Sequence, residues 1–384
     1  MELIWYIIQL SIGYNLVLPL VLYILFVLIA KRKRQVMAAD GIAPDYAIIV
    51  TAYREIAHIP ATVASILKLD YSNFICYVVL DNCDDTSPLQ FDDERVVLLK
   101  PSEVLAGNVR SHFYAISNFK RSHTHLTIID SDNIVDPSYL TELNKYFNQG
   151  FKAVQGIREA KNLNTSYAAL DAARDIYYHL YDGAVLFGLG SSATLAGSGT
   201  AFEVDLYKNC LGAKTVSGAG FDKVLQYEIV KRDIRIAYTD KAIVYDQKTS
   251  KADQLVNQRA RWINTWFKYF KYGFNLLGLG IKNRSVNQLL FGVTLVRPPL
   301  FIFLLLSVGF LLINIFINPL AALVWLGALL IFIAGFVVAL QYYKADPRII
   351  KALKSIPRFM FYQVISLFYS RKANQRSVAT KHFG

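Results

Sequence analysis

Three long apolar runs constrain what this chain can fold into. Residues 3–30 are nearly uncharged, and two further runs, at about 300–317 and 320–340, are separated by Asn318-Pro319. Each run is long enough to cross a hydrocarbon layer of ~30 Å as a helix. The mean hydropathy is +0.31, which is too apolar for an ordinary soluble enzyme of 384 residues. The sequence therefore predicts an integral membrane protein with a sizeable water-soluble part.

The basic residues gather beside the apolar runs. The formal net charge is +12. The tetrad Lys31–Arg34 and the stretch 344–384, which has nine Lys or Arg and one acid, account for this excess. A nucleic-acid-binding protein would spread such charge over its folded domain, whereas cytoplasmic flanks of membrane helices concentrate it. The first run begins with Met1-Glu2 and ends in basic residues, so we expect a retained anchor rather than a signal peptide. We expect the N-terminus outside an inner or plasma membrane and both basic clusters in the cytoplasm.

Residues 44–280 have the pattern of an α/β domain between the apolar runs. Short apolar stretches alternate with helical patterns, which is typical of a largely parallel sheet covered by helices, with its sites where the strands end. The expected strands are 47–50, 77–80, 96–99 and 126–129, and the expected helices include 59–67 and 108–119.

Four regions follow from this pattern. We expect an anchor at 1–34, a cytoplasmic α/β domain at 35–280, two membrane helices at 281–343 and a basic tail at 344–384. The stretch after Pro357 is aromatic, basic and amphipathic, which predicts a helix lying in the membrane interface.

Acidic residues follow two of the expected strands. Asp81 ends one stretch, and Asp130 and Asp132 end another. Two carboxylates one residue apart can share a hard divalent cation, Mg²⁺ or Mn²⁺, that in turn holds a diphosphate. The same residues are also common in simple turns, so this motif leaves both interpretations open.

Two further motifs lie later in the chain. Asp222 begins a helical pattern after Gly220, where a carboxylate can cap a helix or accept a proton from a nucleophile. In the motif Gln258-x-x-Arg261-Trp262, the guanidinium can bind phosphate oxygens. The indole offers a flat face to a sugar ring, or it anchors the chain at the membrane interface.

In this order, the motifs resemble the membrane-integrated branch of glycosyltransferase family 2, which includes cellulose, hyaluronan and poly-N-acetylglucosamine synthases and ceramide glucosyltransferases. The resemblance implies a GT-A-type, Rossmann-like mixed sheet inserted between transmembrane helices. It also implies an inverting, metal-dependent glycosyltransferase that uses a UDP-sugar. A saccharide acceptor and a β-linked polysaccharide are the first expectation, and single transfer to a lipid is the alternative. The expected partners are further copies of the chain, in a homo-oligomer, or accessory export proteins. We expect no nucleic-acid partner.

The resemblance also implies residue roles. Asp222 is the expected base, and Asp130 and Asp132 are the expected metal ligands. The expected nucleotide-sugar contacts are Thr51, Ala52, Tyr53, Glu55, Asp81, Asp130, Asp132, Gln258 and Arg261, and the expected acceptor contacts are Trp262, Gly197, Ser198 and Gly199.

The chain departs from the family pattern at the base. Thr-Glu-Asp is here Gly220-Phe221-Asp222, with Glu228 as a rival carboxylate. A catalytically inactive membrane adaptor and a transporter are the alternative interpretations from other classes. The transporter interpretation needs ionisable residues inside the membrane, and the apolar runs have almost none.

Overall fold

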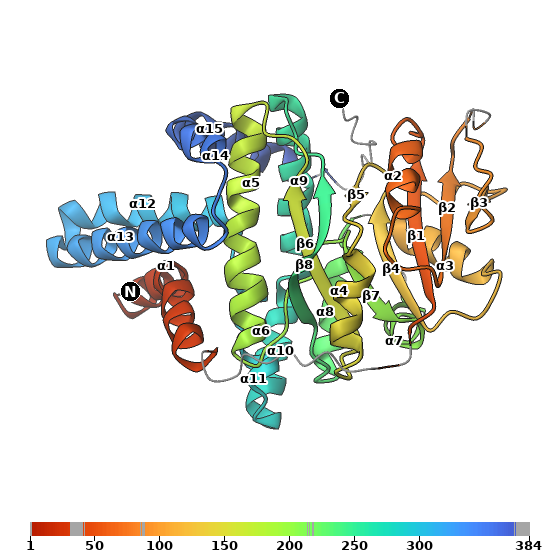
Figure 1. The fold of residues 1–384 in the computed structure, drawn as a ribbon. Coiled ribbons are helices and arrows are strands. Elements are labelled where there is room, and N and C mark those ends of the chain that lie inside the picture. The colour runs from red at the N-terminus through yellow and green to blue at the C-terminus, as the bar shows by residue number, and fades with distance from the viewer. Residues whose placement is uncertain are drawn as a thin grey trace.

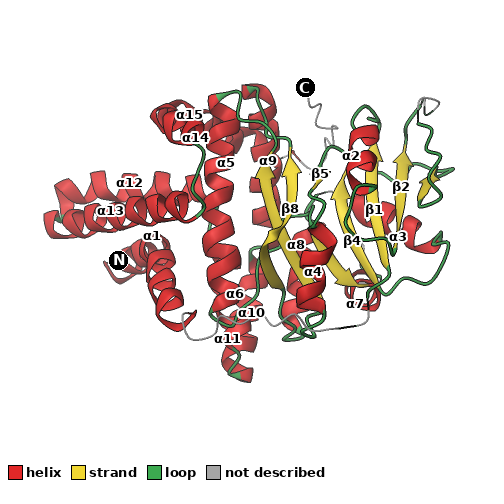
Figure 2. Ribbon diagram, in the orientation of Figure 1, coloured by secondary structure: helices red, strands yellow, loops and turns green. Residues whose placement is uncertain are grey.

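An eight-stranded sheet stands beside a group of long apolar helices in the computed structural model of the chain (Figure 1). The structure describes residues 2–30, 41, 43–84, 86, 89–212, 214, 216, 219–371 and 373. The basic tetrad Lys31–Arg34 and residues 374–384 of the predicted tail lie outside the described residues. Figure 2 separates the two parts, with the strands on the right and the long helices on the left.

The sheet is mixed, with the strand order β3-β2-β1-β4-β7-β6-β8-β5. Its first four strands run parallel, while β7 runs antiparallel to both neighbours and β5 runs antiparallel to β8. The strands are β1 (Tyr46–Tyr53), β2 (Phe74–Asp81), β3 (Val96–Leu99), β4 (His125–Asp130), β5 (Ile134–Val135), β6 (Ala153–Ala160), β7 (Thr200–Glu203) and β8 (Ala237–Asp246). All four predicted strands are present, and the expected α/β sheet of GT-A type is confirmed.

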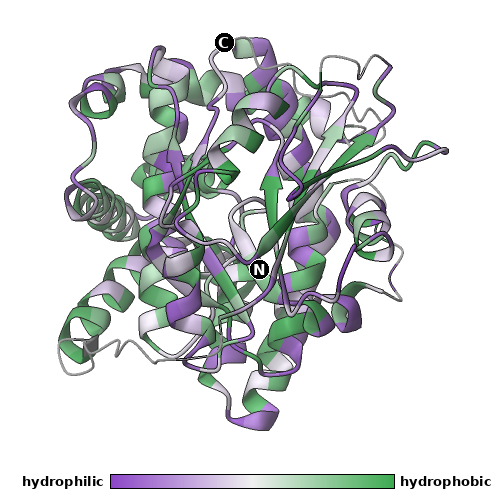
Figure 3. Ribbon diagram, turned by 45° about the vertical axis from the view of Figure 1, so that its right-hand side comes forward, coloured by the Kyte–Doolittle hydropathy of each residue, from purple (hydrophilic) through white to green (hydrophobic). Residues whose placement is uncertain are grey.

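Helices cover both faces of the sheet, which explains why β1 and β2 are apolar without alternation. Successive side chains of β1 point to opposite faces, so Ile48 packs on one side and Ile49 on the other. One face carries α2 (Ile59–Ile66) and α4 (Tyr139–Phe147), and the other carries α3 (Asn108–Ser117), α7 (Val204–Leu211) and α8 (Phe221–Lys231). Figure 3 shows the hydrophobic residues in green along the central strands.

A layer of helices separates the sheet from the apolar helices. In Figure 1, α5 and α9 stand upright at this boundary and α10 and α11 lie below them. The layer comprises α5 (Ser166–Tyr178), the π-helix η1 (His179–Val185), α6 (Leu186–Gly188), α9 (Ala252–Tyr269), α10 (Lys271–Asn283) and α11 (Val286–Val296). The domain boundary expected at residue 280 falls inside α10.

Three of the described helices are long and apolar enough to cross a membrane. They are α1 (Glu2–Ala30), α12 (Leu300–Ile317) and α13 (Pro319–Tyr342). Asn318 ends α12 and caps α13, accepting a hydrogen bond from the Ala321 amide at 3.1 Å, and Pro319 fits the first helical position.

The three apolar helices meet at the end far from the sheet, and α1 also contacts α13 near the sheet. Far from the sheet, the Gln9 side-chain oxygen accepts hydrogen bonds from Asn314 Nδ2 at 2.6 Å and Trp325 Nε1 at 2.7 Å. Near the sheet, the Tyr23 ring lies 6.4 Å from Tyr342 and 6.5 Å from Tyr181. The beginning of α1 and the turn between α12 and α13 therefore lie at the same end of the bundle.

The end of the described chain returns to α9. It forms α14 (Pro347–Ala352), the 3₁₀ turn η2 (Leu353–Ser355) and α15 (Ile356–Ser370). Phe359 is buried, whereas Phe361 and Phe368 are exposed, and Asn264 of α9 donates a hydrogen bond to the Ser370 carbonyl. The predicted amphipathic segment is thus one helix, with one face on the protein and an aromatic face outward.

Candidate active site

One large cavity, of about 1260 Å³, lies where the parallel strands end and continues toward the apolar helices. The register explains its position, because Tyr53 pairs with Asp81 and Thr51 pairs with Asp130. Most of the predicted site residues line it: Thr51, Ala52, Tyr53, Glu55, Asp81, Asp130, Asp132, Gly197, Asp222, Gln258, Arg261 and Trp262. The fold therefore brings together motifs that are up to about two hundred positions apart in the sequence.

Asp81, at the end of β2, is buried and lines this cavity. Its two carboxylate oxygens accept hydrogen bonds from the amides of Leu105, at 2.9 Å, and Ala106, at 2.8 Å. Ala106 has a φ of +46°, which a non-glycine residue adopts only at some cost. The carboxylate thus holds the 105–106 loop in place at the rim of the cavity.

The Asp130–Asp132 turn is supported from behind by the Gly197–Gly199 loop. Ser198 Oγ accepts a hydrogen bond from the Asp130 amide at 3.1 Å and donates one to Asn133 Oδ1 at 2.6 Å. Ser198 is fully buried, and of the three loop residues only Gly197 lines the cavity. Ser198 therefore positions the acidic turn, which the sequence pattern did not indicate.

The acidic turn is chemically suited to a divalent cation. Burial, together with the nearby Asp246 carboxylate, raises the pKa of Asp132, so a bound cation would favour its ionised form. Among the described residues, no three His, Cys, Asp or Glu side chains cluster closely enough to hold a metal by themselves. The arrangement fits a cation held by one or two carboxylates and completed by phosphate oxygens and water, as Mg²⁺ commonly is.

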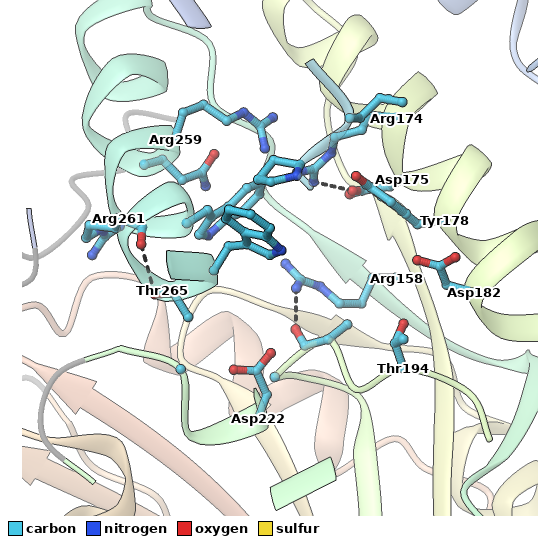
Figure 4. Close-up of a pocket in the computed structure, with 18 of the residues that line it drawn as sticks. Arg158, Arg174, Asp175, Tyr178, Asp182, Thr194, Asp222, Arg259, Arg261 and Thr265 are labelled. Atoms are coloured by element: carbon cyan, nitrogen blue, oxygen red, sulfur yellow. Dashed lines mark hydrogen bonds and ion pairs between the residues drawn. The ribbon is translucent and has the colours of Figure 1, made fainter. Parts of the chain in front are cut away.

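Asp222 lies in the first turn of α8 and lines the same cavity. Gly220, just before it, has a φ of +102°, and a methyl group there would lie 2.6 Å from Thr265 Cγ2 on α9. Only glycine allows this approach, which brings Asp222 to the cavity beside α9. Figure 4 shows Asp222 pointing into the cavity, opposite Arg174 and Arg259.

The rival carboxylate is placed elsewhere. Glu228 does not line the cavity. Its oxygens lie 2.8 Å from Arg232 and 3.1 Å from Lys214. Burial would raise the pKa of Glu228, but these two hydrogen-bonded cations outweigh that effect and lower it. Among the described residues, Glu228 therefore has a structural role, as the ion-pair partner of Arg232 and Lys214.

Trp262 of α9 has two cationic neighbours. The guanidinium carbons of Arg174 and Arg259 lie 4.2 and 4.1 Å from its ring centroid, a separation typical of cation–π contacts. The residue keeps 38% of its surface exposed. Arginine thus occupies part of the ring surface that the sequence predicted for a sugar. Burial lowers the pKa of the neighbouring Arg261, which also lines the cavity.

A chain of buried charges forms the wall behind Trp262, and the sequence analysis missed it. Ion pairs link its seven members in the order Arg158, Asp246, Lys248, Asp175, Arg174, Asp171, Arg259. These residues come from β6, β8 and its following loop, α5 and α9. The clustering of Asp171, Arg174 and Asp175 in an alanine-rich helix is the one local signal that could have indicated a buried polar face.

Comparison with known proteins agrees with this architecture. The profile of the family described as glycosyltransferase-like family 2 matches residues 44–265, and a search of curated proteins finds no match. Among solved structures, a mannosyltransferase from Pyrobaculum calidifontis, in complex with GDP-mannose and Mn²⁺, is similar with a TM-score of 0.57 and 14% identity. The match covers 95% of this chain and 98% of that one.

A second similar structure is S. aureus TarS 1–349 with UDP-GlcNAc, with a TM-score of 0.44, 13% identity, and coverage of 86% of this chain and 90% of that one. The likeness to the Pyrobaculum structure concerns the fold. Because the family profile covers more than half of the sequence, the chain belongs to glycosyltransferase-like family 2.

Proposed function

We propose that this protein is an inverting, metal-dependent membrane glycosyltransferase that takes its sugar from a UDP-sugar. The observation that carries the proposal is the shared cavity. It is lined by Asp130, Asp132 and Asp222 and by Gln258, Arg261 and Trp262 of α9. An acidic pair, a separate carboxylate and a phosphate-binding arginine are the parts that a single displacement at a sugar carbon needs.

Each part has a proposed role. The Thr51–Tyr53 strand end, Glu55 and Asp81 contact the nucleoside. Asp130 and Asp132 hold Mg²⁺ or Mn²⁺, which when bound neutralises charge on the departing diphosphate. Gln258 and Arg261 bind the diphosphate oxygens, and Trp262 and Gly197 lie at the acceptor end.

Asp222 acts as the base. It takes the proton of an acceptor hydroxyl, whose oxygen bonds to the anomeric carbon from the face opposite UDP. The bond from that carbon to the UDP oxygen breaks, and the electron pair leaves with UDP. One displacement inverts the configuration, so an α-linked donor gives a β-glycoside. An α-linkage in the product, read from its anomeric proton coupling, would contradict this mechanism.

The acceptor is proposed from the lining of the cavity. A saccharide acceptor and a polysaccharide product were the first expectation from the sequence. The apolar lining contributed by α12 and α13 favours the alternative, single transfer to a lipid. The three candidate membrane helices also offer little material for a polysaccharide channel. The product distinguishes the two acceptors. A polymer ladder on a gel would indicate a polysaccharide, and one modified lipid on a thin-layer plate would indicate single transfer to a lipid.

We propose a cytoplasmic catalytic part at residues 35–280 and an N-terminus outside the membrane. The hydrogen bonds of Gln9 with Asn314 and Trp325 support three crossings, because they place the N-terminus and the α12–α13 turn at the same end of the bundle.

The Asp222→Asn variant tests the proposal. It should lower transfer by about 10²–10⁴-fold, the usual contribution of a general base, while donor binding stays near wild type. UDP release and donor binding are measured with a panel of UDP-sugars, with GDP-mannose included because of the Pyrobaculum complex, each with and without Mn²⁺. Glu228→Gln is the matched control and should keep transfer. Loss of donor binding in Asp222→Asn would mean that another residue is the base.

A further inference from the structure

The cavity extends beyond Trp262 into an apolar lobe. Its walls there come from α12, α13 and α15, with Leu304 and Val308, Leu329 and Ile333, and Ile356 and Met360 among the lining side chains. From the start of α12 to Val308 the helix rises by ~12 Å at 1.5 Å per residue. The lobe therefore reaches well into the layer that the three apolar helices define.

The lobe is open at its side. Val308 and Ile333 line it, yet they keep 44% and 55% of their surfaces exposed, on helices whose outer faces suit only lipid. A sugar chain in such a lobe would lose hydrogen bonds to water without replacing them, which costs free energy at every hydroxyl. An acyl chain would lose nothing and would bury apolar surface.

Two arginines, Arg259, which is buried, and Arg174, which is half-buried, mark the junction between the polar cavity and the lobe. Arg259 is 3% exposed. Its Nε and Nη1 atoms, and Nε of Arg174, are buried and have no hydrogen-bond partner within the part of the chain that the structure describes. Both residues line the cavity and contact the Trp262 ring. Donors that are buried and unpaired call for an acceptor.

The charge balance points the same way. At the Trp262 end of the chain, Arg174 and Arg259 share Asp171, and Asp175 is shared by Arg174 and Lys248, whereas Arg158 at the other end also faces Asp130. Burial and the adjacent Arg174 lower the pKa of Arg259 to about 10, which still leaves it protonated at neutral pH. A further anion beside two arginines that share one carboxylate would stabilise them.

We propose that the acceptor is a membrane lipid whose phosphate headgroup binds Arg174 and Arg259 and whose apolar chain lies between α12, α13 and α15. A hydroxyl of the same headgroup then takes the sugar in the displacement described above, with Asp222 as the base. This inference rests on the proposed function and names its acceptor class. A soluble phosphate compound has the same headgroup chemistry, so the test must separate the two sources.

The test uses the full chain in phosphatidylcholine nanodiscs with its best UDP-sugar. Three probes are compared: phosphatidylglycerol, which has phosphate, hydroxyl and chains; diacylglycerol, which lacks phosphate; and soluble glycerol 3-phosphate, which lacks chains. The measurements are sugar in the organic extract, UDP release and the thermal unfolding midpoint. The variants are Arg259→Gln and Val308→Trp. Their matched controls are Arg121→Gln, a surface arginine paired with Asp45, and Leu312→Trp, one turn further along α12 and outside the cavity lining.

We expect transfer to phosphatidylglycerol to exceed transfer to diacylglycerol by about ten- to hundredfold, the range for losing charge-assisted hydrogen bonds. It should also exceed transfer to glycerol 3-phosphate, because that probe keeps the phosphate but buries no apolar chain. Arg259→Gln should remove this preference, and Val308→Trp should reduce lipid transfer because the indole fills the lobe, with both controls near wild type. Equal use of diacylglycerol, equal use of glycerol 3-phosphate, or equal losses in Leu312→Trp and Val308→Trp would overturn the inference. If no donor releases UDP but phosphatidylglycerol still raises the midpoint of wild type and not of Arg259→Gln, the proposed function fails and the lipid site stands.

Discussion

At the scale of single residues, Gly220 shows how a backbone position sets the chemistry. It combines a left-handed conformation with close contact to Thr265 and Tyr269 of α9, and the base proposed at Asp222 depends on that contact. Gly150 also has a positive φ, of +86°, but nothing lies within 4 Å of its missing side chain. Comparing Gly220 with Gly150 therefore separates the cost of a left-handed backbone from an effect on the geometry of the site.

We therefore expect Gly220→Ala to lose both stability and transfer. The left-handed backbone costs an alanine ~1–3 kcal/mol, and the methyl group must also push α8 away from α9, which moves Asp222. Gly150→Ala should show only the stability loss. Unfolding midpoints and turnover measured for both variants check this, and equal turnover in the two would contradict the proposed role of Gly220.

Asp132 leads to a prediction on pH. Its pKa in the folded chain lies above the ordinary aspartate value, chiefly because of burial and then because of Asp246. Ionisation is therefore harder in the folded state, so this group favours folding below its ordinary pKa, and the benefit is lost as pH rises through the folded pKa. Asp132→Asn should be more stable than wild type at neutral pH without metal, yet inactive. Mn²⁺ should raise the unfolding midpoint of wild type only, and a less stable variant would refute burial as the cause of the raised pKa.

At the scale of elements, the buried charge chain fastens α5 to the sheet and to α9. Lys248, after β8, lies 2.5 Å from Asp175 and 2.8 Å from Asp246. Burial would lower the pKa of Lys248, but these two carboxylates outweigh that effect and raise it. The lysine thus joins helix and strand where the cavity wall forms.

Removing this lysine should be severe. Lys248→Met leaves Asp246 with Arg158 and Asp175 with Arg174 but breaks the buried link between these two pairs, and removing one partner of a buried ion pair typically costs ~3–5 kcal/mol. Lys145→Met, at an exposed pair with Glu142, should cost about 0–1 kcal/mol. Denaturant unfolding in detergent measures both, and similar losses in the two variants would show that the chain of charges contributes little.

The elements differ in how far they could be predicted. Strand 96–99 and the helix at 300–317 were predicted with their observed bounds, because apolar runs between breaking residues report on local structure. The acidic turn was found for the same reason. The proximity of Arg174 to Arg259 and the hydrogen bond between Ser198 and Asp130 could not be predicted. Tertiary packing brings these segments together, and the local sequence pattern of one segment does not indicate the other.

At the scale of the whole molecule, the proposed topology can be tested with cysteines. The native Cys76, Cys83 and Cys210 are buried, and burial raises the pKa of the Cys76 thiol to about 12, so none should react with a maleimide. In intact cells an impermeant maleimide should label Phe316→Cys, near the α12–α13 turn. Glu94→Cys, exposed beside the sheet, should react only after permeabilisation. The reverse pattern would place the catalytic part outside.

The open side of the apolar lobe has a kinetic consequence. A substrate that enters through that opening approaches by diffusion within a sheet of lipid, so the quantity that governs its encounter rate is its mole fraction there. Diluting the acceptor with inert lipid should then slow turnover even when the total amount in the tube is unchanged. The product would leave by the same opening into the leaflet that supplied its precursor, so any passage to the other leaflet would be a separate event.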